Sequence, residues 1–343
     1  MRELISQKRA RQIIGRMRGR RLGVLGDWML DRYVWGTANR ISPEAAVPVV
    51  DFAKESDCLG GAGNVAANLA ALGARVSGFG VVGRDEAGTS LVRRMHELKI
   101  SEAGLVEDAK RKTTVKTRII ARQQQIVRVD REDKFPLNEE VEGALARRFR
   151  RHSMKLDAVV ISDYDKGVVT ESLMQEVLAR CGQGKISVFL KPKWSRIDKY
   201  PGATVVAVNR REAEYLVRNP LESDEAVSTA GRKLLEHFGC AAVLITRGEA
   251  GLDLVDRENA GVFHVAARNK EREMSLGVRE TGRQVFDVTG AGDTVLATMA
   301  LAAASGASLR EAAVLGNAAA GVVVGKLGTA TLTREELLNA LKD

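Results

Sequence analysis

The octapeptide Asp287-Val-Thr-Gly290-Ala-Gly292-Asp293-Thr294 leads directly into an apolar helical pattern, and the rest of the chain is best interpreted from it. Gly290 and Gly292 permit a tight turn and a close approach of a ligand to the backbone. The free amides of Ala291, Gly292 and Asp293 then point along the helix axis, at the positive end of its dipole. Such a turn is typical of a binding site for a phosphoryl group.

The acid inside this turn needs an explanation, because a carboxylate repels phosphate. Removing the proton from an attacking hydroxyl group is the natural role. A weak base suffices in phosphoryl transfer, since the loose transition state requires little early deprotonation of the nucleophile. We therefore predict that Asp293 is a general base, with Gly290, Ala291 and Gly292 forming the anion turn. The alternative, a purely structural first-turn residue, is less favoured because Thr289 can already cap the helix.

Short apolar runs, often rich in β-branched residues, alternate with helical patterns along the chain. The expected strands are 21–25, 158–161, 187–190, 204–208 and 242–245. The expected helices are 64–72, 88–98, 139–151, 171–179, 212–217 and 224–237. This alternation predicts an α/β fold in which a doubly wound, mainly parallel sheet is flanked by helices.

Segments 31–50 and 113–130 interrupt the pattern and have the alternation of exposed strands. Within 112–122, even positions hold the basic residues Lys112, Lys116, Arg118 and Arg122, whereas the odd positions are apolar or threonine. One face of this strand is therefore predicted to be basic. Because the apolar face must be buried somewhere, we expect a small projecting β-sheet lid that also forms a homodimer interface.

The composition narrows the class of protein. The chain has 343 residues, of which 45% are hydrophobic, enough for a substantial core, and 4% are aromatic. So few aromatic residues argue against a protein that stacks single-stranded nucleic acid on exposed rings. The net charge of +9 is concentrated in residues 1–21, which carry eight basic side chains and one acid. For residues 1–20 we favour a basic helix packed on the domain; a nucleic-acid or membrane-surface patch and an organelle presequence are the alternatives.

The sequence indicates neither a metal cluster nor a membrane span. The three cysteines, Cys58, Cys181 and Cys240, lie far apart, and the four histidines are equally scattered. The cysteines are therefore interpreted as free thiols in a reducing compartment. No secretory segment is found, and the longest apolar stretches are too short to span a bilayer. We expect a soluble, cytoplasmic protein that binds neither nucleic acid nor membrane.

The octapeptide, and the order of motifs from about Arg21 onward, resemble the ribokinase-like (PfkB) carbohydrate kinases. The resemblance implies one kinase domain over 21–343, with ATP and Mg²⁺ as cofactors. It also implies that Asp27, which follows the first expected strand, holds sugar hydroxyl groups. The segment Gly60-Gly61-Ala62-Gly63-Asn64 resembles the substrate-side glycine signature of the family. Glycine backbone lets a sugar ring lie against the chain, and the Asn64 amide both donates and accepts hydrogen bonds; a glycine-rich turn into a helix is the alternative.

Three further motifs fall on the nucleotide side of the family's site. Asn209-Arg-Arg-Glu212 matches the family's Asn-x-x-Glu, which is associated with Mg²⁺ and phosphate through water, as suits this ion. Thr246-Arg247-Gly248-Glu-Ala-Gly251 resembles the turn that covers the nucleotide phosphates. Asn317 lies on the helix that lines the adenine pocket in relatives.

The chain departs from the family at Leu190-Lys191-Pro192-Lys193, where relatives typically have Asp-Pro-Lys. Lys193 retains the family's lysine and is a cofactor-binding candidate. Lys191 places a base where an acid is usual, near the expected nucleotide phosphates. The exchange would strengthen phosphate binding, disturb Mg²⁺ or slow turnover, and the sequence does not choose among these effects.

Four segments resemble a narrower group, the heptose-7-phosphate kinases of bacterial ADP-heptose synthesis for the lipopolysaccharide core. They are 27–33, 40–44, 162–167 and 321–329. This resemblance implies phosphorylation of the anomeric C1 hydroxyl of D-glycero-β-D-manno-heptose 7-phosphate. A phosphorylated substrate requires cations in its pocket, and the candidates are Arg40, Lys116, Arg118, Arg128 and Lys166. Many relatives fuse this kinase to a nucleotidyltransferase, but the chain contains no His-x-Gly-His motif, so only the kinase step is implied.

Features of the sequence suggest three alternative functions. One is a ribokinase-like kinase for another sugar, sugar phosphate or nucleoside, and another is a non-catalytic sugar or nucleotide sensor, against which the intact Asp293 argues. The third is an NAD-dependent oxidoreductase, because 78–83 fits G-x-G-x-x-G and Glu102 follows at a suitable distance. Phe79, Val81 and Val82 predict a strand through these glycines, however, and not a turn that opens a helix.

Overall fold

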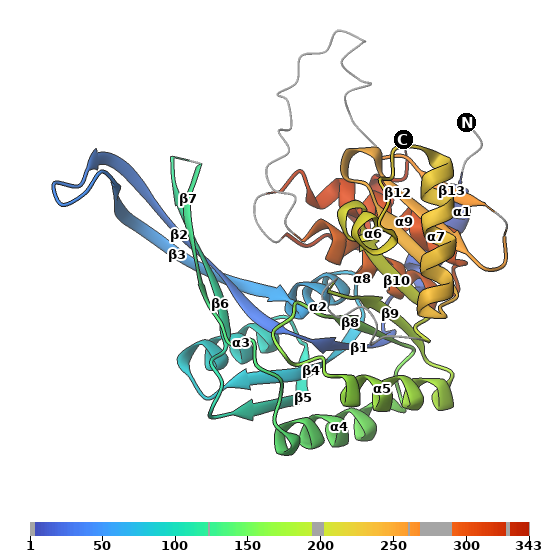
Figure 1. The fold of residues 1–343 in the computed structure, drawn as a ribbon, viewed down its shortest axis with the longest axis horizontal. Coiled ribbons are helices and arrows are strands. Elements are labelled where there is room, and N and C mark those ends of the chain that lie inside the picture. The colour runs from blue at the N-terminus through green and yellow to red at the C-terminus, as the bar shows by residue number, and fades with distance from the viewer. Residues whose placement is uncertain are drawn as a thin grey trace, which may run out of the picture.

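The computed structural model describes residues 4–122, 124–193, 202–259, 261–267, 290–326 and 330–342, which form two sheets (Figure 1). The large sheet has, in spatial order, strands β13 (Val262–Val265), β12 (Leu252–Asp256), β11 (Ala242–Thr246), β10 (Val205–Asn209), β9 (Ser187–Lys191), β8 (Ala158–Ser162), β1 (Arg21–Gly26), β4 (Arg75–Gly83) and β5 (Ser101–Asp108). It is parallel from β11 to β5, and β12 and β13 form an antiparallel edge. The predicted α/β fold is confirmed.

Helices cover both faces of the large sheet. One face carries α1 (Gln7–Arg16), α2 (Ala62–Ala71), α3 (Glu86–Glu97), α8 (Ala291–Ala304), α9 (Leu309–Val323) and α10 (Arg334–Asn339). The other carries α4 (Glu139–Ser153), α5 (Glu171–Gly184), α6 (Arg210–Val217) and α7 (Asp224–Phe238). Strand β8 shows why its sequence is continuously apolar: Ala158 and Val160 enter one core, and Val159 and Ile161 enter the other.

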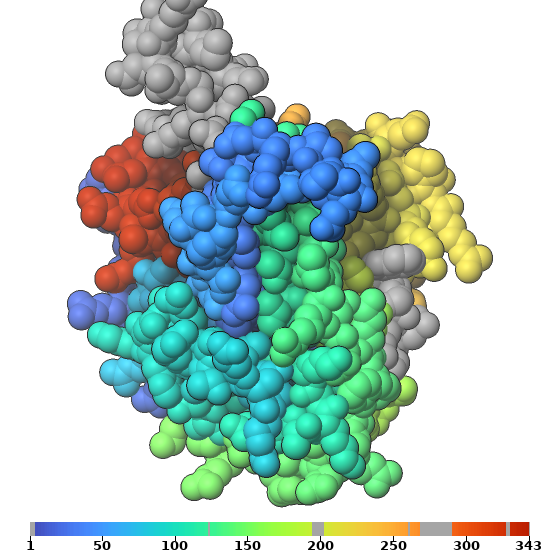
Figure 2. Space-filling model, turned by 90° about the vertical axis from the view of Figure 1, so that its left-hand side faces the viewer, coloured from blue at the N-terminus to red at the C-terminus, as the bar shows by residue number. Residues whose placement is uncertain are grey.

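The small sheet projects from the body of the molecule, as Figure 1 shows at the left. Its order is β3 (Pro48–Gly61), β2 (Trp28–Ile41), β6 (Thr114–Ala121) and β7 (Gln124–Arg131). In Figure 2 the blue β2–β3 hairpin stands forward across the upper part of the molecule. The predicted lid segments lie in these strands, and β3 continues to Gly61 and passes directly into α2.

The basic N-terminal segment forms α1, whose Ala10, Ile13 and Ile14 are buried. Arg9 lies on the same helix, and its Nε is 2.7 Å from Glu311 Oε1 of α9. The excess charge of this segment therefore accompanies an ordinary packed amphipathic helix. Among the described residues, no helix is both long and apolar enough to cross a membrane.

The G-x-G-x-x-G segment lies inside strand β4, and α3 begins only at Glu86. A Cβ atom on Gly78 would lie 2.6 Å from Trp28 Cζ2, and one on Gly80 would lie 2.4 Å from Trp28 Cδ1. The indole Nε1 donates a hydrogen bond of 2.9 Å to the carbonyl oxygen of Phe79. These glycines therefore make room for a buried indole ring and do not cradle a dinucleotide.

Gly26 gives a test of how strand β1 is joined to β8. Its φ is +147°, and a Cβ atom there would lie 2.0 Å from the carbonyl oxygen of Ser162. Gly26→Ala must push β8 away or strain the backbone, so we expect the free energy of unfolding to fall by about 2–4 kcal/mol in urea denaturation.

Gly182→Ala is the matched control, because a Cβ atom at this position in α5 has no neighbouring atom within 4 Å. Alanine has the higher helix propensity, so this variant should be about 0.5–1 kcal/mol more stable than wild type. Equal stability of Gly26→Ala and wild type would contradict the close β1–β8 contact.

Candidate active site

The carboxyl ends of the central strands meet where the strand order reverses. From β1 the sheet grows through β4 and β5 to one side, and from β8 it grows through β9, β10 and β11 to the other. The register pairs Gly26 with Ser162, and Ser162 with Lys191, so these strands end level with one another. Ligands of open α/β sheets bind at such a switch point.

Asp293 lies in the first turn of α8, above this switch point. Gly290 precedes the helix with φ +86°, and its carbonyl oxygen accepts a hydrogen bond of 3.0 Å from the amide of Thr294. The Asp293 side chain is only 2% exposed. Asp287 and Thr289, the other motif residues considered from the sequence, lie outside the described residues.

Three other elements direct polar groups at the Asp293 carboxylate. Its Oδ2 accepts hydrogen bonds from Asn64 Nδ2, at 3.2 Å, and from the hydroxyl of Tyr164, at 2.7 Å. Its Oδ1 lies 2.7 Å from the ammonium nitrogen of Lys191. These groups come from α2, from the loop after β8 and from the last residue of β9. Asp293 is thus the centre of a polar cluster and has more partners than a helix cap needs.

Burial affects the protonation of the groups around Asp293. Burial, and then the negative charge of Asp293, raise the pKa of Tyr164, so the phenol stays protonated and donates. For Lys191, burial alone would lower the pKa, but the charge and hydrogen bond of Asp293, together with Tyr164 and Glu212, outweigh burial and raise the pKa above its ordinary value. The amide of Asn64 is oriented by Asn68, whose Nδ2 donates to Asn64 Oδ1 at 3.2 Å.

Asp27 follows β1 and is buried, but its carboxylate is occupied by backbone. It accepts hydrogen bonds from the amides of Tyr164 at 2.7 Å, Lys166 at 3.2 Å and Val168 at 3.4 Å. Burial, followed by the charge of Asp163, raises the pKa of Asp27 to about 7. Asp27 therefore holds the loop that carries Tyr164 and Lys166, while its contact with sugar hydroxyls stays a prediction.

The two glycines at the end of β3 allow close approach to acidic residues. A Cβ atom on Gly60 would lie 2.4 Å from Asp31 Oδ2, and one on Gly61, where φ is +56°, would lie 2.5 Å from the carbonyl oxygen of Asp27. The glycine segment then continues into α2, which places Asn64 at the candidate base. This close packing explains why side chains are excluded here.

Beside this cluster lies a hollow of about 310 Å³, which Tyr164 connects to Asp293. It is lined by Lys116, Arg128, Asp130, Glu132, Lys134, Tyr164, Asp165, Lys166 and Lys193. Lys166 Nζ lies 2.8 Å from Glu132 Oε1, and Lys116 Nζ lies 3.3 Å from Asp130 Oδ2. Cations outnumber carboxylates among these described residues, so the hollow suits an anion.

The hollow gathers three of the five predicted phosphate-binding cations, Lys116, Arg128 and Lys166. Lys193, which was expected on the nucleotide side, lines it as well. Lys134 was missed, although residues 128, 130, 132 and 134 are all charged and their period of two was a usable signal in the sequence.

The other two predicted cations do not line the hollow. Arg118 is buried, and its guanidinium lies 2.5 Å from Asp31 Oδ1 and over the ring of Tyr33. Arg40 is 67% exposed and pairs at 3.7 Å with Asp51. It lies twelve residues beyond Trp28 on β2, a distance of about 40 Å along an extended strand. Within one chain, Arg40 is therefore not brought to the other candidates.

On the nucleotide side, Asn209 and Glu212 form a reciprocal cap at the start of α6. Asn209 Oδ1 accepts from the amide of Glu212 at 2.9 Å, and Glu212 Oε2 accepts from the amide of Asn209 at 2.8 Å. The second carboxylate oxygen suits Mg²⁺, which binds mainly water and phosphate and takes few protein ligands. The described residues contain no group of three or more His, Cys, Asp or Glu side chains arranged to hold a metal.

The remaining nucleotide-side candidates occupy the turn after β11 and helix α9. Thr246 ends β11, and Gly248 and Gly251 have φ values of +59° and +92°. Arg247 Nη1 lies 3.1 Å from buried Asp253 Oδ2, which ties the turn to β12. Asn317 Nδ2 donates to the carbonyl oxygen of Ala266 at 2.9 Å. Arg247 thus anchors the turn, and Asn317 anchors the segment after β13 to α9.

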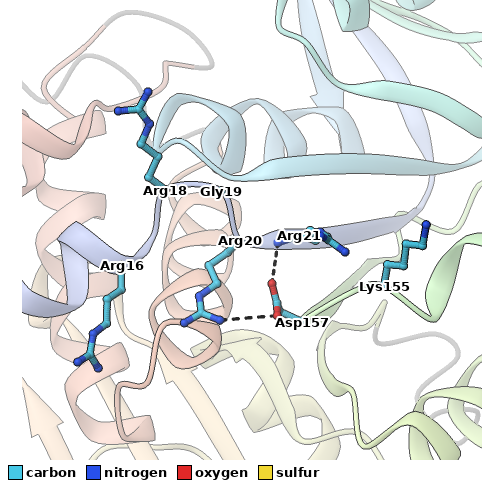
Figure 3. Close-up of a pocket in the computed structure, with 7 residues that line it drawn as sticks. All are labelled: Arg16, Arg18, Gly19, Arg20, Arg21, Lys155 and Asp157. Carbon is cyan, nitrogen blue, oxygen red and sulfur yellow. Dashed lines mark hydrogen bonds and ion pairs between the residues drawn. The ribbon is translucent and has the colours of Figure 1, made fainter.

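A second hollow, of about 510 Å³, lies at the opposite, amino end of β1 (Figure 3). It is lined by Arg16, Arg18, Gly19, Arg20, Arg21, Lys155 and Asp157. Asp157 accepts from the amide of Arg21 at 2.8 Å and pairs with Arg20 at 3.7 Å, while Arg16, Arg18 and Lys155 point in different directions. The length of β1 separates this hollow from Asp27, so it is not part of the candidate active site.

Comparison with known proteins identifies related chains. The family model described as "pfkB family carbohydrate kinase" matches residues 22–336. The chain is 44% identical over 318 residues to the bifunctional protein HldE of Geobacter sulfurreducens, with 93% of this chain and 62% of the relative covered. It is 42% identical over 328 residues to HldE of Paramagnetospirillum magneticum, with 96% and 64% covered. The chain thus spans less than two thirds of the length of these relatives.

Solved structures share the fold. Arabidopsis thaliana ribokinase complexed with ribose and ATP superposes with a TM-score of 0.70 at 19% identity, covering 95% of this chain and 99% of that one. Phosphofructokinase-2 of Escherichia coli, in complex with substrates and products, superposes with a TM-score of 0.72 at 21% identity, with 94% and 98% covered.

Proposed function

The chain belongs to the pfkB family of carbohydrate kinases, and on that premise we propose that it transfers the γ-phosphoryl group of ATP to the C1 hydroxyl of D-glycero-β-D-manno-heptose 7-phosphate. The product would be the 1,7-bisphosphate, a precursor in ADP-heptose and lipopolysaccharide core synthesis. One observation carries the proposal: a buried carboxylate, Asp293, stands at the start of α8 beside a hollow rich in cations. We place the enzyme in the cytoplasm, where ATP is supplied.

In this reaction the helix and its first acid have separate roles. The amides of Ala291 and Gly292 would bind oxygens of the γ-phosphoryl group, since they lie at the positive end of α8. The Asp293 carboxylate would take the proton of the C1 hydroxyl while the sugar oxygen forms its bond to phosphorus. The bond from phosphorus to the β–γ bridging oxygen breaks, and its electron pair leaves with ADP.

Mg²⁺ would supply positive charge to the nucleotide phosphates when bound. Glu212, with Asn209 beside it, would hold the ion through water at the end of β10. The turn from Thr246 to Gly251 would cover the phosphates, and Asn317 would face the adenine side. Asn64 and Tyr164 would keep the carboxylate of Asp293 oriented toward the sugar oxygen.

The 7-phosphate would bind in the 310 Å³ hollow. Lys116 and Lys166 are 16% and 12% exposed and both lie close to Glu132. A phosphate dianion offers them more charge than one carboxylate, so both ammonium groups can turn from Glu132 to the ligand. This specificity for a sugar that already carries phosphate distinguishes the proposal from a kinase for a free sugar.

Asp293→Asn removes the proposed base but keeps the size of the side chain. We expect kcat to fall by about 10²–10⁴, with ATP affinity nearly unchanged, in an ADP-release assay with heptose 7-phosphate. Glu86→Gln, which neutralises an exposed acid in the first turn of α3, should behave as wild type. Wild-type turnover in Asp293→Asn would remove the role assigned to this residue.

Lys116→Ala combined with Lys166→Ala tests the phosphate site. The expected result is a rise of about 10–100-fold in KM for heptose 7-phosphate, because charge-assisted hydrogen bonds are lost. The KM for unphosphorylated heptose should change much less, and Lys110→Ala, an exposed lysine elsewhere, should change neither. Equal losses for both sugars would show that these lysines do not bind the phosphate.

We also propose that the chain forms a homodimer through the small sheet. Six large apolar side chains are exposed on this sheet and its hairpin turn: Ile41, Val47, Phe52, Ile126, Val127 and Val129, with exposed fractions of 37–67%. Exposed apolar strands of this kind are normally covered by a partner.

Phe52→Asp places a charge on this surface, at the most exposed of its apolar side chains, so sedimentation velocity should show a monomer where wild type sediments as a dimer. Leu98→Asp changes an exposed apolar side chain outside the sheet and should leave the dimer intact. A dimer that survives Phe52→Asp unchanged would contradict this interface.

A further inference from the structure

Among the described residues, Lys191 is the cation that pairs with the candidate base, and it stands at the position where the sequence departs from the Asp-Pro-Lys of related kinases. Its Nζ lies 2.7 Å from Asp293 Oδ1 and 3.4 Å from the Tyr164 hydroxyl, and it sits 5.3 Å from the centre of the Tyr164 ring. The Lys191 side chain is 25% exposed, whereas that of Asp293 is 2% exposed. The ammonium group is therefore the more accessible partner of this ion pair.

Lys191 is placed where it can reduce the electrostatic repulsion between Asp293 and a bound phosphoryl group. A phosphoryl group bound at the start of α8 would lie beside the Asp293 carboxylate, and two negative groups in a partly buried site repel each other strongly. A positive charge between them turns this repulsion into two attractions. Lys191 already provides that charge on a side chain whose terminal bonds rotate freely.

The ammonium group is also within reach of the anion turn. A Cβ atom placed on Gly292 would lie 3.6 Å from Lys191 Nζ, so the lysine lies directly over the backbone expected to bind the phosphoryl oxygens. Lys191 is the last residue of β9, and this strand fixes its Cα. A rotation of the side chain alone can thus carry Nζ from the carboxylate to a bound phosphoryl group.

We propose that Lys191 is a catalytic residue that moves from Asp293 to the γ-phosphoryl group when the nucleotide binds. This inference rests on the proposed kinase reaction. While Lys191 pairs with Oδ1, that oxygen is blocked, and Oδ2 is held by Asn64 and Tyr164. Departure of the ammonium group frees Oδ1 to accept the proton of the sugar hydroxyl. Lys191 keeps its own protons throughout and stabilises the charge of the phosphoryl group during transfer.

The first test measures binding and needs no turnover. Isothermal titration calorimetry compares ADP with the non-hydrolysable analogue AMP-PNP, which carries the γ-phosphoryl group. We expect wild type to bind AMP-PNP more tightly than ADP, and Lys191→Met to lose at least about tenfold of that preference. Lys191→Arg should keep most of it. Lys233→Met, which changes an exposed lysine of α7, should keep all of it.

The second test measures turnover with heptose 7-phosphate. Lys191→Met, and Lys191→Gln as a second neutral variant, should lower kcat by about 10²–10³ while KM for the sugar changes only a few-fold. Lys191→Arg should lose less than tenfold, because it retains the charge. Circular dichroism melting identifies any variant that fails to fold, and the remaining neutral variant then decides the result.

The outcomes separate this inference from the proposed function. Unchanged or faster kcat in the neutral variants would overturn it, and a faster rate would show that the lysine blocks the base. A lower kcat with an unchanged AMP-PNP preference would also overturn it, since Lys191 would then only position Asp293. If no sugar phosphate supports ADP formation by wild type, the proposed function fails. Calorimetry then still decides whether Lys191 contacts the γ-phosphoryl group.

Discussion

The need to keep one carboxylate charged in a buried position is the constraint on which the rest of the site depends. Two unit charges 4 Å apart interact by about 4 kcal/mol at the effective dielectric constant found near protein surfaces, and an unpaired buried charge costs more. Asp293 meets this constraint through Asn64, Tyr164 and Lys191, each from a different element. All of those elements must meet at the same edge of the sheet. The site therefore depends on the register of β1, β8 and β9, which makes these strands end level with one another.

The two sheets contribute different parts of the candidate site. The large sheet supplies a rigid edge, and buried Asp27 ties the loop after β8 to β1 through three backbone amides. The small sheet brings Lys116 and Arg128 to the side of that loop. The nucleotide-side candidates are thus anchored on the large sheet, and the sugar-side cations lie largely on the small one. This division would let the acceptor pocket vary while the phosphoryl-binding turn stays constant.

The central strands and the candidate base were predictable from the sequence because their signals are local. A strand buried on both faces reads as an apolar run, and the anion turn is a continuous motif. Edge strands β5, β12 and β13 were missed, since they carry polar residues such as Glu102, Asp253 and His264 that pair with one another or with neighbours. The contacts of Asp293 with Tyr164 and Lys191 connect residues that are more than 100 positions apart in the sequence. No local sequence pattern predicts such contacts. The role of Arg40 stays a prediction, because the local motif that suggested it does not report how far β2 projects from the hollow.

A crystal structure of the ternary complex with AMP-PNP and heptose 7-phosphate is the most direct test of the role assigned to Asp293. We expect the sugar C1 oxygen within about 3 Å of an Asp293 carboxylate oxygen and about 3–3.5 Å from the γ-phosphorus. The 7-phosphate should lie against Lys116 and Lys166. A structure in which the sugar binds elsewhere, and Asp293 still contacts only Asn64, Tyr164 and Lys191, would contradict this role.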